Sequence, residues 1–346
     1  MARYALLLLP SANRVYARSS TPLAVAELAV FGQSALGREL PSAKTTVLGG
    51  VPYLEVDADE LGPRQTSFLA NMSSIFALFE VEPRGLLKPV ELHRLDRFDD
   101  DLITIQKYQG KTNEQFTKLL LNVTLMASAF AAEMLDRKLT VLDPLCGRGT
   151  TMNQALMYGY DAAGIDIDQK DFDAYSAFIK SWLKRKRIKH KVDYDSPVRR
   201  EGKIAGRRLQ VTLAASRDDW KEGENQQLDM VCADTTRALE FFRPSSFDLI
   251  VADAPYGVHH GSRTSARGLT RHPQDLLAAA VPAWIQLLRP GGAIGIAWNT
   301  FVAPRAAAST ILTEAGLDVA DSGPYLDFRH RVDQAIQRDI IVARRP

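Results

Sequence analysis

A glycine-containing turn after a short apolar stretch is the first feature of the sequence that could perform chemistry. Residues 140–143 are typical of a buried strand, and Gly147 and Gly149 precede an expected helix over 152–158. Glycine has no Cβ, so such a turn after a first parallel strand lets a ligand approach the backbone closely. Met152 stands where a dinucleotide fingerprint has its third glycine, and no lysine follows Gly149 as in a Walker loop. Pyridine nucleotides and nucleoside triphosphates are therefore both disfavoured as the ligand.

Acidic residues follow the next three predicted strands, at Asp166, Asp234 and Asp253. Asp166 lies 19 residues beyond Gly147, about the spacing at which a carboxylate accepts hydrogen bonds from ribose hydroxyls. Asp234 is placed to accept from an adenine amino group. A single acid after a strand is more often a helix cap than a ligand. Three such acids on successive strands, together with the glycine turn, favour a ligand-binding edge.

The last of these strands leads into the segment Asp253-Ala254-Pro255-Tyr256. This segment resembles the amine-methylating signature of class I S-adenosylmethionine methyltransferases, in which an acid or amide precedes Pro-Pro-Tyr, although Ala254 replaces the first proline. Pro255 still biases residue 254 away from helical dihedrals, and the carbonyl of that residue is free to accept a hydrogen bond. The simpler alternative is an ordinary turn built on Asp and Pro.

The residue types in this segment suit an exocyclic nucleobase amine as the nucleophile. The lone pair of such an amine is delocalised into the ring, so the amine must be pyramidalised and oriented before it attacks a sulfonium methyl group. Asp253 and the Ala254 carbonyl would accept hydrogen bonds from the amine, and Tyr256 would stack on the base. We therefore predict that Asp253, Ala254, Pro255 and Tyr256 form the catalytic segment, with no metal.

A longer set of motifs resembles the tRNA guanosine 2-amino (N2) methyltransferases with THUMP-type N-terminal regions. The resemblance covers roughly residues 105–345 and includes Tyr108-Gln-Gly110-Lys-Thr112, Gly164-Ile-Asp166-Ile-Asp168 and the stretch from Asp253 to Arg263. It implies a guanine in the body of a tRNA as target, S-adenosylmethionine as cofactor, an N-terminal region that recognises tRNA and, often in eukaryotic members, a small activating partner protein. The predicted cofactor-binding residues are Thr112, Asp143, Pro144, Cys146, Gly147, Gly149, Thr150, Asp166, Ile167, Asp234 and Thr235.

Positive charge is concentrated in one segment of a chain whose net charge is only +2. Residues 180–208 contain twelve Lys and Arg against three Asp and Glu, which leaves the remainder net negative. We interpret this basic run as a phosphate-binding face, the alternative being a solvated surface excursion. Arginines further along, at 263–271, would share a helix face beside the catalytic segment if they are helical. The predicted RNA-binding residues are Lys184, Arg185, Lys186, Arg187, Arg199, Arg200, Arg263 and Arg267.

The overall composition is that of an ordinary folded protein with room for two domains. The chain has 346 residues, of which 46% are hydrophobic and 24% charged. The first apolar run ends at Pro10 after a few residues, so we expect neither a signal peptide nor a membrane anchor. The two cysteines, Cys146 and Cys232, have no partner at metal-ligand spacing and fit a reducing cytoplasm.

The order of predicted elements divides the chain into a small N-terminal α/β domain, 1–95, a linker, 96–112, and a larger domain, 113–346. Short apolar runs alternate with helices in the larger domain, which predicts a doubly wound, Rossmann-like class I methyltransferase sheet. An insertion at about 178–223 contains the basic run and is expected to add a helix and a strand, or a hairpin. Strands are expected over 4–9, 46–56, 86–92, 140–143, 161–166, 228–233, 248–252, 293–298 and 339–343, and further helices over 22–36, 65–79 and 113–137.

Two other functions are compatible with the same residues. A DNA adenine or cytosine amine methyltransferase shares the signature after the fourth strand and would need base flipping, but no large target-recognition domain is evident. A methyltransferase-fold binding protein without catalysis would follow if Ala254 disables the site. Methylation of a protein glutamine amide uses a similar signature, but it would leave the basic insertion without a purpose.

Overall fold

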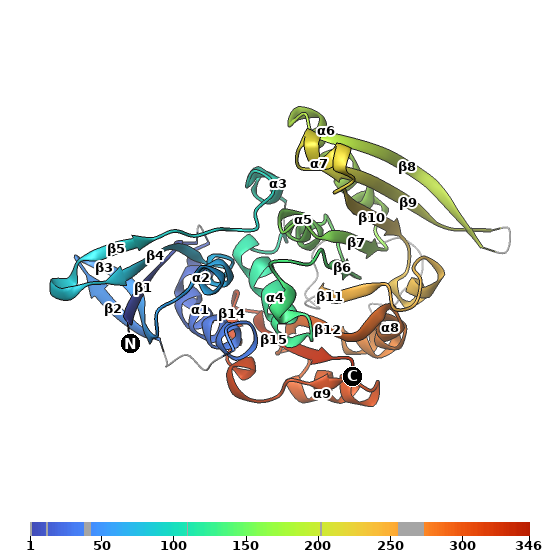
Figure 1. Cartoon of the computed structure of the whole chain (residues 1–346). Coiled ribbons are helices and arrows are strands. Elements are labelled where there is room, and N and C mark those ends of the chain that lie inside the picture. The colour runs from blue at the N-terminus through green and yellow to red at the C-terminus, as the bar shows by residue number, and fades with distance from the viewer. Residues whose placement is uncertain (1, 12, 38–42, 109, 201–202, 255–272) are drawn as a thin grey trace.

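Two β-sheets organise the chain, as Figure 1 shows for this computed structural model. The structure describes residues 2–11, 13–37, 43–108, 110–200, 203–254 and 273–346. The smaller sheet has the order β2-β3-β1-β4-β5, and all its pairings are antiparallel. Its elements are β1 (Ala2–Leu8), α1 (Arg14–Ser34), β2 (Lys44–Leu48), β3 (Val51–Ala58), α2 (Pro63–Ala70), β4 (Ile75–Val81), a 3₁₀ turn (Pro83–Gly85) and β5 (Leu87–Val90).

Helix α1 is longer than the sequence predicted, because it begins at Arg14 rather than at Pro22. The side chain of Asn13 caps the helix by accepting hydrogen bonds from Val15 N at 2.9 Å and Tyr16 N at 3.2 Å. Pro22 lies inside the helix. The Asn13 cap and the burial of Tyr16 and Leu23 stabilise the helix on both sides of the proline and together offset its local cost.

The predicted helix over 65–79 is wrong in its second half. Helix α2 ends at Ala70, and residues 75–81 form strand β4, which pairs with β1. The short apolar stretch fits either structure locally, and tertiary pairing decided in favour of the strand. Similarly, the extended segment predicted over 46–56 is two strands joined at Gly49 and Gly50, which both adopt positive φ.

The larger sheet has the order β13-β15-β12-β11-β6-β7-β10-β9-β8, with β14 attached to β15. Strands β10, β7, β6, β11 and β12 are parallel to one another, and the outer strands are antiparallel. The strands are β6 (Thr140–Asp143), β7 (Asp161–Asp166), β8 (Lys189–Arg200), β9 (Lys203–Ala214), β10 (Gln226–Cys232), β11 (Phe247–Asp253), β12 (Leu288–Asn299), β13 (Asp318–Val319), β14 (His330–Arg331) and β15 (Gln337–Arg344).

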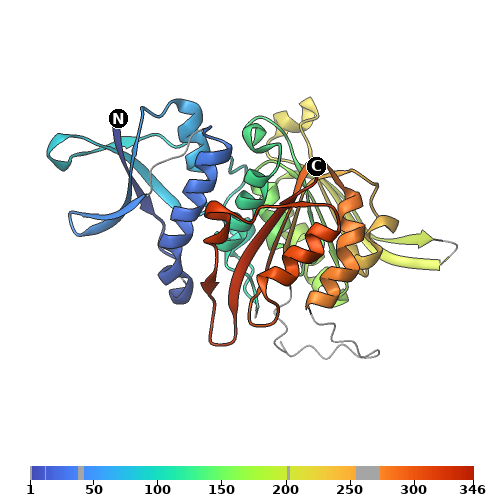
Figure 2. The ribbon, with the colours of Figure 1, turned by 90° about the horizontal axis from the view of Figure 1, so that it is seen from below.

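Helices cover both faces of this sheet (Figures 1 and 2). Residues of α4, α5 and α6 share one core cluster with Val141 and Val251, whereas α8 and α9 share the other with Leu142 and Ile250. Neighbours along a strand thus face opposite layers, as expected for a doubly wound α/β fold. The helices are α3 (Asp101–Thr104), α4 (Glu114–Ala127), α5 (Thr150–Met157), α6 (Gln169–Arg185), α7 (Arg217–Glu222), α8 (Pro273–Leu287) and α9 (Arg305–Glu314), with 3₁₀ turns η2 (Ala131–Glu133), η3 (Thr235–Glu240) and η4 (Gly323–Leu326).

The strand order reverses at β6, which confirms the predicted Rossmann-like fold. The chain proceeds from β6 to β7 and β10 on one side and returns through β11 and β12 on the other. Ligands of open α/β sheets bind outside the carboxyl ends of the strands at such a reversal. The strands predicted over 140–143 and 161–166 have those bounds in the structure.

The insertion forms the hairpin of β8 and β9, one of the two predicted alternatives. Strand β9 pairs antiparallel with β10 and extends the sheet at that edge. Figures 1 and 2 show the far end of the hairpin projecting from the body of the protein. The basic run therefore spans the end of α6 and this hairpin.

A buried polar cluster joins α1 to the larger unit. The carboxylate of Glu27 accepts from Ser73 N at 2.9 Å, from Ser73 Oγ at 2.6 Å and from Asn122 Nδ2 on α4 at 2.7 Å.

Helix α4 ends at Ala127, ten residues before the predicted end at Arg137. Beyond the helix, Ala129 N donates to the Gly291 carbonyl. Among the helices of the described ranges, none is long and apolar enough to cross a membrane.

Removing the carboxylate of Asp248 is expected to destabilise the larger sheet strongly. Asp248 is fully buried at the start of β11 and contacts Arg137 and Arg289 at 2.7 Å each and Thr140 N at 2.9 Å. Asp248→Ala removes the buried carboxylate that two arginines share, and we expect a loss of about 3 kcal/mol in the free energy of unfolding by urea. As the control, Asp218→Ala removes one partner of an exposed ion pair with Lys221, and it should leave the free energy of unfolding almost unchanged. Equal losses of stability in the two variants would contradict this prediction.

Candidate cofactor and amine-binding site

The predicted acidic residues gather along one edge of the large sheet. Asp143, Asp166 and Asp253 end β6, β7 and β11, and Asp234 follows β10. Because these four strands are parallel, their carboxyl ends lie side by side at the reversal of strand order. The structure thus brings together residues that are separated by more than a hundred positions in the sequence.

The carboxylate of Asp166 holds the glycine turn after β6. Its Oδ2 accepts from Gly147 N at 2.7 Å, and its Oδ1 accepts from Asp168 N at 2.8 Å. Cys146 N donates to the Ile165 carbonyl at 3.0 Å, while burial of its thiol raises the pKa of Cys146. Cys146 therefore supports the turn by packing and through its backbone.

Space around the two glycines of this turn differs sharply. Gly147 has φ +48° and a Cβ added there would meet no atom within 4 Å. Gly149 has φ +78°, and its Cβ would lie 2.4 Å from the ring of Tyr175. Gly147 thus leaves room for a ligand against the backbone, whereas Gly149 is required by packing against α6.

Asp143 is nearly buried at the end of β6, with 4% of its surface exposed. Its carboxylate accepts from Leu145 N at 3.1 Å and from the side chain of Thr151. Burial, together with the neighbouring carboxylates of Asp253 and Asp166, raises the pKa of Asp143 to about 7. A positively charged ligand beside Asp143 would favour the ionised form of this residue, so this edge suits a cation such as a sulfonium.

The side chains after β7 and β10 are divided between the surface and the core. Ile167 is 69% exposed, which is unusual for a large aliphatic residue next to a polar strand end. Asp234 accepts from Thr236 N at 2.9 Å and from Thr236 Oγ1 at 2.8 Å. Thr235 is buried, and its hydroxyl accepts from Trp284 Nε1 at 2.9 Å. Thr235 therefore anchors this turn, while Ile167 offers an apolar surface.

Thr112 lies against the predicted amine acceptor rather than against the glycine turn. Its Oγ1 donates to Asp253 Oδ2 at 2.5 Å. Ala254 is buried, and its backbone N donates to the carbonyl of Ala297 on β12 at 2.8 Å. The other predicted residues of this region, Pro255, Tyr256, Arg263 and Arg267, lie outside the described residues.

A contact over the start of α5 involves residues that the sequence analysis did not predict. Arg148 lies 4.7 Å from the ring centre of Tyr108, and the Tyr108 hydroxyl is 3.3 Å from Thr150 Oγ1. Asp171 on α6 holds Arg148 by an ion pair of 2.8 Å. Tyr108 belongs to a motif of the family resemblance, which could have indicated it. Arg148 and Asp171 belong to no sequence motif that would have indicated them.

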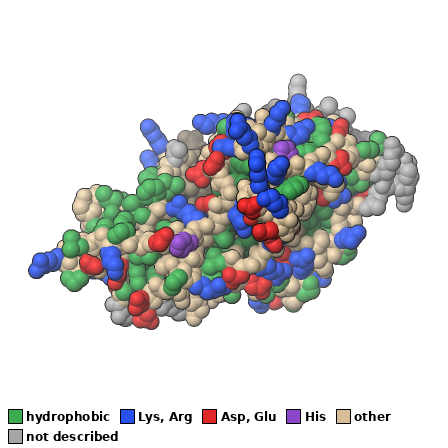
Figure 3. Space-filling view, turned by 45° about the horizontal axis from the view of Figure 1, so that its top comes forward, with side chains coloured by type: hydrophobic (Ala, Val, Ile, Leu, Met, Phe, Trp, Pro, Cys, Tyr) green, Lys and Arg blue, Asp and Glu red, His purple; other side chains and the backbone are tan. Residues whose placement is uncertain are grey.

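Part of the basic run forms ion pairs with neighbouring carboxylates. Lys186 forms ion pairs with Asp99 at 2.7 Å and with Asp101 at 2.8 Å, and Arg185 lies 3.4 Å from Asp101. Figure 3 shows Lys and Arg side chains with acidic ones directly beside them. Lys184 and Arg187 are exposed. Arg199 and Arg200 lie at the end of β8.

The edge of the sheet fits a nucleoside with a cationic sulfur. Gly147 leaves open space at the turn, Asp166 and Asp234 supply carboxylates, and the exposed face of Ile167 can contact an adenine ring. Pro144 and Thr150 lie on either side of the turn, and Thr150 begins α5. These residues would hold S-adenosylmethionine, whose sulfonium supplies an electrophilic methyl group.

The reversal of strand order, the glycine turn and this row of acids define a Rossmann-like methyltransferase. A family model described as "RMKL-like, methyltransferase domain" matches residues 118–290, half of the chain. The chain therefore belongs to the RMKL-like methyltransferase domain family, and S-adenosylmethionine is its cofactor. None of the curated proteins matches the chain significantly.

Solved structures of methyltransferases are distantly similar to the chain. A TehB-like SAM-dependent methyltransferase from Corynebacterium glutamicum is 14% identical, with a TM-score of 0.35, and the match covers 62% of this chain and 84% of that one. The precorrin-6y C5,15-methyltransferase from Geobacter metallireducens is 12% identical, with a TM-score of 0.39, and the match covers 73% of this chain and 98% of that one. The 1,6-didemethyltoxoflavin-N1-methyltransferase from Burkholderia thailandensis is 17% identical, with a TM-score of 0.35, and the match covers 63% of this chain and 76% of that one.

Alanine at Gly147 is expected to weaken cofactor binding without unfolding the protein. The added methyl group meets no protein atom, so it would occupy space that the cofactor needs, and the left-handed backbone adds only about 1 kcal/mol of strain. We expect at least a tenfold higher Kd for S-adenosylmethionine by calorimetry, with a small change in Tm. Gly149→Ala should instead lower Tm markedly through its clash with Tyr175. Unchanged affinity in Gly147→Ala would show that the cofactor does not approach this residue.

Proposed function

We propose that this methyltransferase acts on an exocyclic amine of a nucleobase, namely the 2-amino group of a guanosine in tRNA. The observation that carries the proposal is the position of Asp253. It ends β11 beside the cofactor edge, and the Thr112 hydroxyl binds one of its oxygens. An acceptor fixed at this point can take a hydrogen bond from an amine placed in line with the transferable methyl group.

The chain's own groups account for activation of such an amine. Thr112 orients the Asp253 carboxylate, and a carboxylate has several acceptor sites, so it can also accept a hydrogen bond from the amino group. That hydrogen bond localises the nitrogen lone pair and directs it toward the methyl carbon. Positioning and electrostatics supply most of the rate enhancement, and the proton is lost to Asp253 or to water once the new bond has formed.

A tRNA substrate is supported by features outside the cofactor edge. Exposed cations at the end of α6, including Lys184 and Arg187, and the projecting hairpin of β8 and β9 offer contacts to phosphates. We further propose that the N-terminal unit, residues 1–95, recognises the tRNA, with 96–112 as the linker. The motif resemblance to the THUMP-type family supports guanine N2 as the acceptor over other amines.

Transfer of a labelled methyl group from S-adenosylmethionine to several substrates in parallel tests this proposal. Unmodified tRNA, duplex DNA and a protein extract would each be incubated with the full chain and with Asp253→Ala. The expected result is label in tRNA, recovered as N2-methylated guanosine, and none with the variant. Label in DNA, in protein or at another atom of the RNA would overturn the proposed substrate. No label in spite of cofactor binding would contradict activity of the isolated chain and would be followed by adding a small activating partner.

A further inference from the structure

An exposed aromatic ring lies at the same edge of the large sheet as the proposed amine acceptor. Phe301 follows β12, which runs parallel to β11 and pairs Ala297 with Asp253. Neighbouring strands lie about 4.8 Å apart, so the turn after β12 is next to the end of β11. Phe301 is 65% exposed and Ile167 is 69% exposed, and these are the two most exposed large hydrophobic side chains of the described residues. They follow β12 and β7, on opposite sides of β11 in the sheet.

The turn after β12 lies on the side of Asp253 that faces away from the cofactor edge. Gly147, Asp166 and Asp234, which we assign to the cofactor, follow β6, β7 and β10. Strand β11 lies between β6 and β12. A base whose amine reaches Asp253 would therefore have the cofactor on one side and the turn after β12 on the other. The nucleotides next to that base would extend over this turn.

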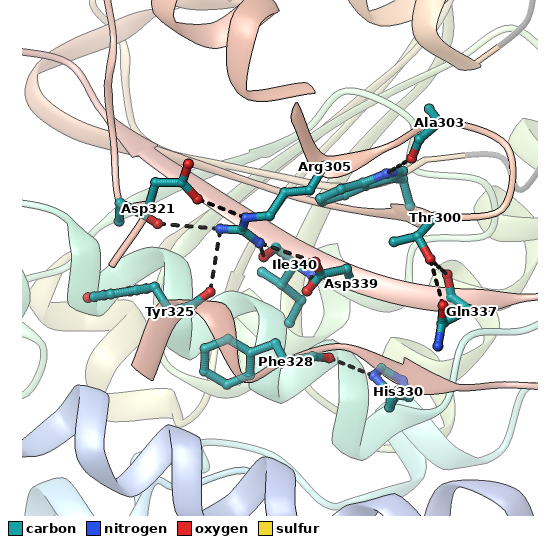
Figure 4. A network of polar contacts seen from close by, with 12 residues as sticks. Thr300, Ala303, Arg305, Asp321, Tyr325, Phe328, His330, Gln337, Asp339 and Ile340 are labelled. Carbon is teal, nitrogen blue, oxygen red and sulfur yellow. Dashed lines mark hydrogen bonds and ion pairs between the residues drawn. The ribbon is translucent and has the colours of Figure 1, made fainter. Parts of the chain in front are cut away.

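A buried asparagine fixes the backbone of the turn that carries Phe301. Asn299 is 2% exposed, and its Oδ1 accepts from Phe301 N and from Gln337 N at 3.1 Å each. Its Nδ2 donates to the Ala335 carbonyl at 3.0 Å. Thr300 N and Oγ1 both donate to the Gln337 carbonyl, at 2.7 and 3.1 Å, and Figure 4 shows the hydroxyl contact. The turn is thus joined to the start of β15 by both side-chain and backbone hydrogen bonds.

Contacts on the α9 side complete the frame of this turn. Trp298 Nε1 donates to the Ala303 carbonyl at 2.8 Å. Arg305, at the start of α9, contacts Asp321 at 3.0 Å and Asp339 of β15 at 3.2 Å (Figure 4). The backbone below the Phe301 ring is therefore already ordered, and a ligand that contacts the ring has less conformational entropy to overcome than on a loose loop.

An exposed cation lies two strands further along the same edge. Strand β15 pairs Arg338 with Asn299 of β12, and it pairs Gln337 with Arg331 of β14. The backbone of Arg331 is therefore two strand spacings, roughly 10 Å, from the turn after β12. Arg331 is exposed, and its Nε donates to the Asp333 carbonyl at 2.9 Å. It forms no ion pair with the residues that the structure describes.

We propose that Phe301 and Arg331 form an RNA-binding rim beside the amine site. The ring of Phe301 stacks on an unpaired base next to the target guanosine, and Arg331 contacts a phosphate of the same segment. Every base has a π-face that can stack on an aromatic ring, and a guanidinium is well matched to phosphate oxygens. Unstacking a nucleotide to expose its amine costs free energy, and stacking of its neighbour on Phe301 offsets part of that cost. This inference rests on the proposed function, which it deepens.

Binding of an unmodified tRNA transcript to the full chain tests the rim without requiring methyl transfer. Phe301→Ala is expected to raise the Kd for the transcript about tenfold, the effect of removing one base–aromatic stack. Phe301→Leu keeps an apolar side chain but has no ring, so it should lose nearly as much affinity, whereas Phe301→Trp should bind at least as tightly. As the matched control, Leu326→Ala removes a side chain of η4 that is 45% exposed, and it should change the Kd less than twofold.

Two further readouts separate stacking from the phosphate contact. Arg331→Gln should weaken binding and reduce the slope of log Kd against log salt concentration by about one ion, whereas Phe301→Ala should leave this slope unchanged. The transcript should quench the additional fluorescence of Phe301→Trp, because a stacked base quenches indole emission. An unchanged salt slope in Arg331→Gln would remove Arg331 from the rim.

A Kd in Phe301→Ala within twofold of that of the unmodified protein, at comparable Tm, would overturn the inference. Full affinity in Phe301→Leu, or an equal loss in Leu326→Ala, would likewise overturn stacking on Phe301. Failure of the transcript to bind the unmodified protein would overturn the rim and the proposed substrate together. If binding depends on Phe301 but no guanosine is methylated, the proposed activity fails and the rim stands. Methylation of guanosine with a Kd that does not depend on Phe301 would overturn the rim alone.

Discussion

Replacing Asp253 by alanine is expected to lower methyl transfer by about 10²- to 10⁴-fold while cofactor affinity stays almost unchanged. Asp253 contacts Thr112 at the end of β11, and we assign it to the amine rather than to the cofactor. Without the carboxylate, the amine keeps its lone pair delocalised and is no longer aimed at the methyl group. Single-turnover transfer to tRNA, together with calorimetric titration of S-adenosylmethionine, measures the two quantities separately.

Two milder variants sharpen this test. Asp253→Asn keeps one acceptor oxygen of similar geometry, so it should retain more activity than the alanine variant. Thr112→Val removes the hydroxyl that donates to Asp253 Oδ2 but keeps the side-chain shape, and we expect about a tenfold loss of transfer, or roughly 1.4 kcal/mol of barrier. If Asp253→Ala transfers methyl groups within tenfold of the unmodified protein, the amine is activated elsewhere.

The second large effect is expected from Asp166→Ala, on cofactor binding. Asp166 accepts hydrogen bonds from Gly147 N and Asp168 N, so its removal loosens the glycine turn and also deletes the predicted acceptor for the ribose hydroxyls. Loss of charged hydrogen bonds of this kind costs about 2 to 3 kcal/mol. The Kd for S-adenosylmethionine should therefore rise roughly 30- to 150-fold.

Asp168→Ala is the matched control for this prediction. Asp168 caps α6 by accepting from Lys170 N at 2.7 Å, only two residues from Asp166. Its loss should lower stability by about 1 kcal/mol and leave cofactor affinity nearly intact. Normal cofactor affinity in Asp166→Ala would remove Asp166 from the ribose and assign it only to the turn.

Local sequence signals predicted the centre of the large sheet well. Strands β6 and β7 lie where the apolar runs before Asp143 and Asp166 indicated them. Buried parallel strands are continuous apolar runs bounded by glycine and acidic residues, so each strand can be recognised from its own few residues. The alternation of strands and helices predicts a parallel sheet, and the acids at the ends of its strands then share one edge.

Tertiary structure decided the features that depend on distant partners. The segment 75–81 became a strand because β1 was available to pair with it, and Lys186 of the basic run forms ion pairs with the distant carboxylates Asp99 and Asp101. Thr112 reaches Asp253 across 141 positions, and His330 packs against the rings of Tyr16 and Phe116 only because β14 and β15 return beside α1 and α4. The sequence by itself determined the type of sheet and the cofactor edge, since those signals are local. The folded chain determined which side chains complete the site, because contacts at such separations depend on topology and not on neighbouring residues.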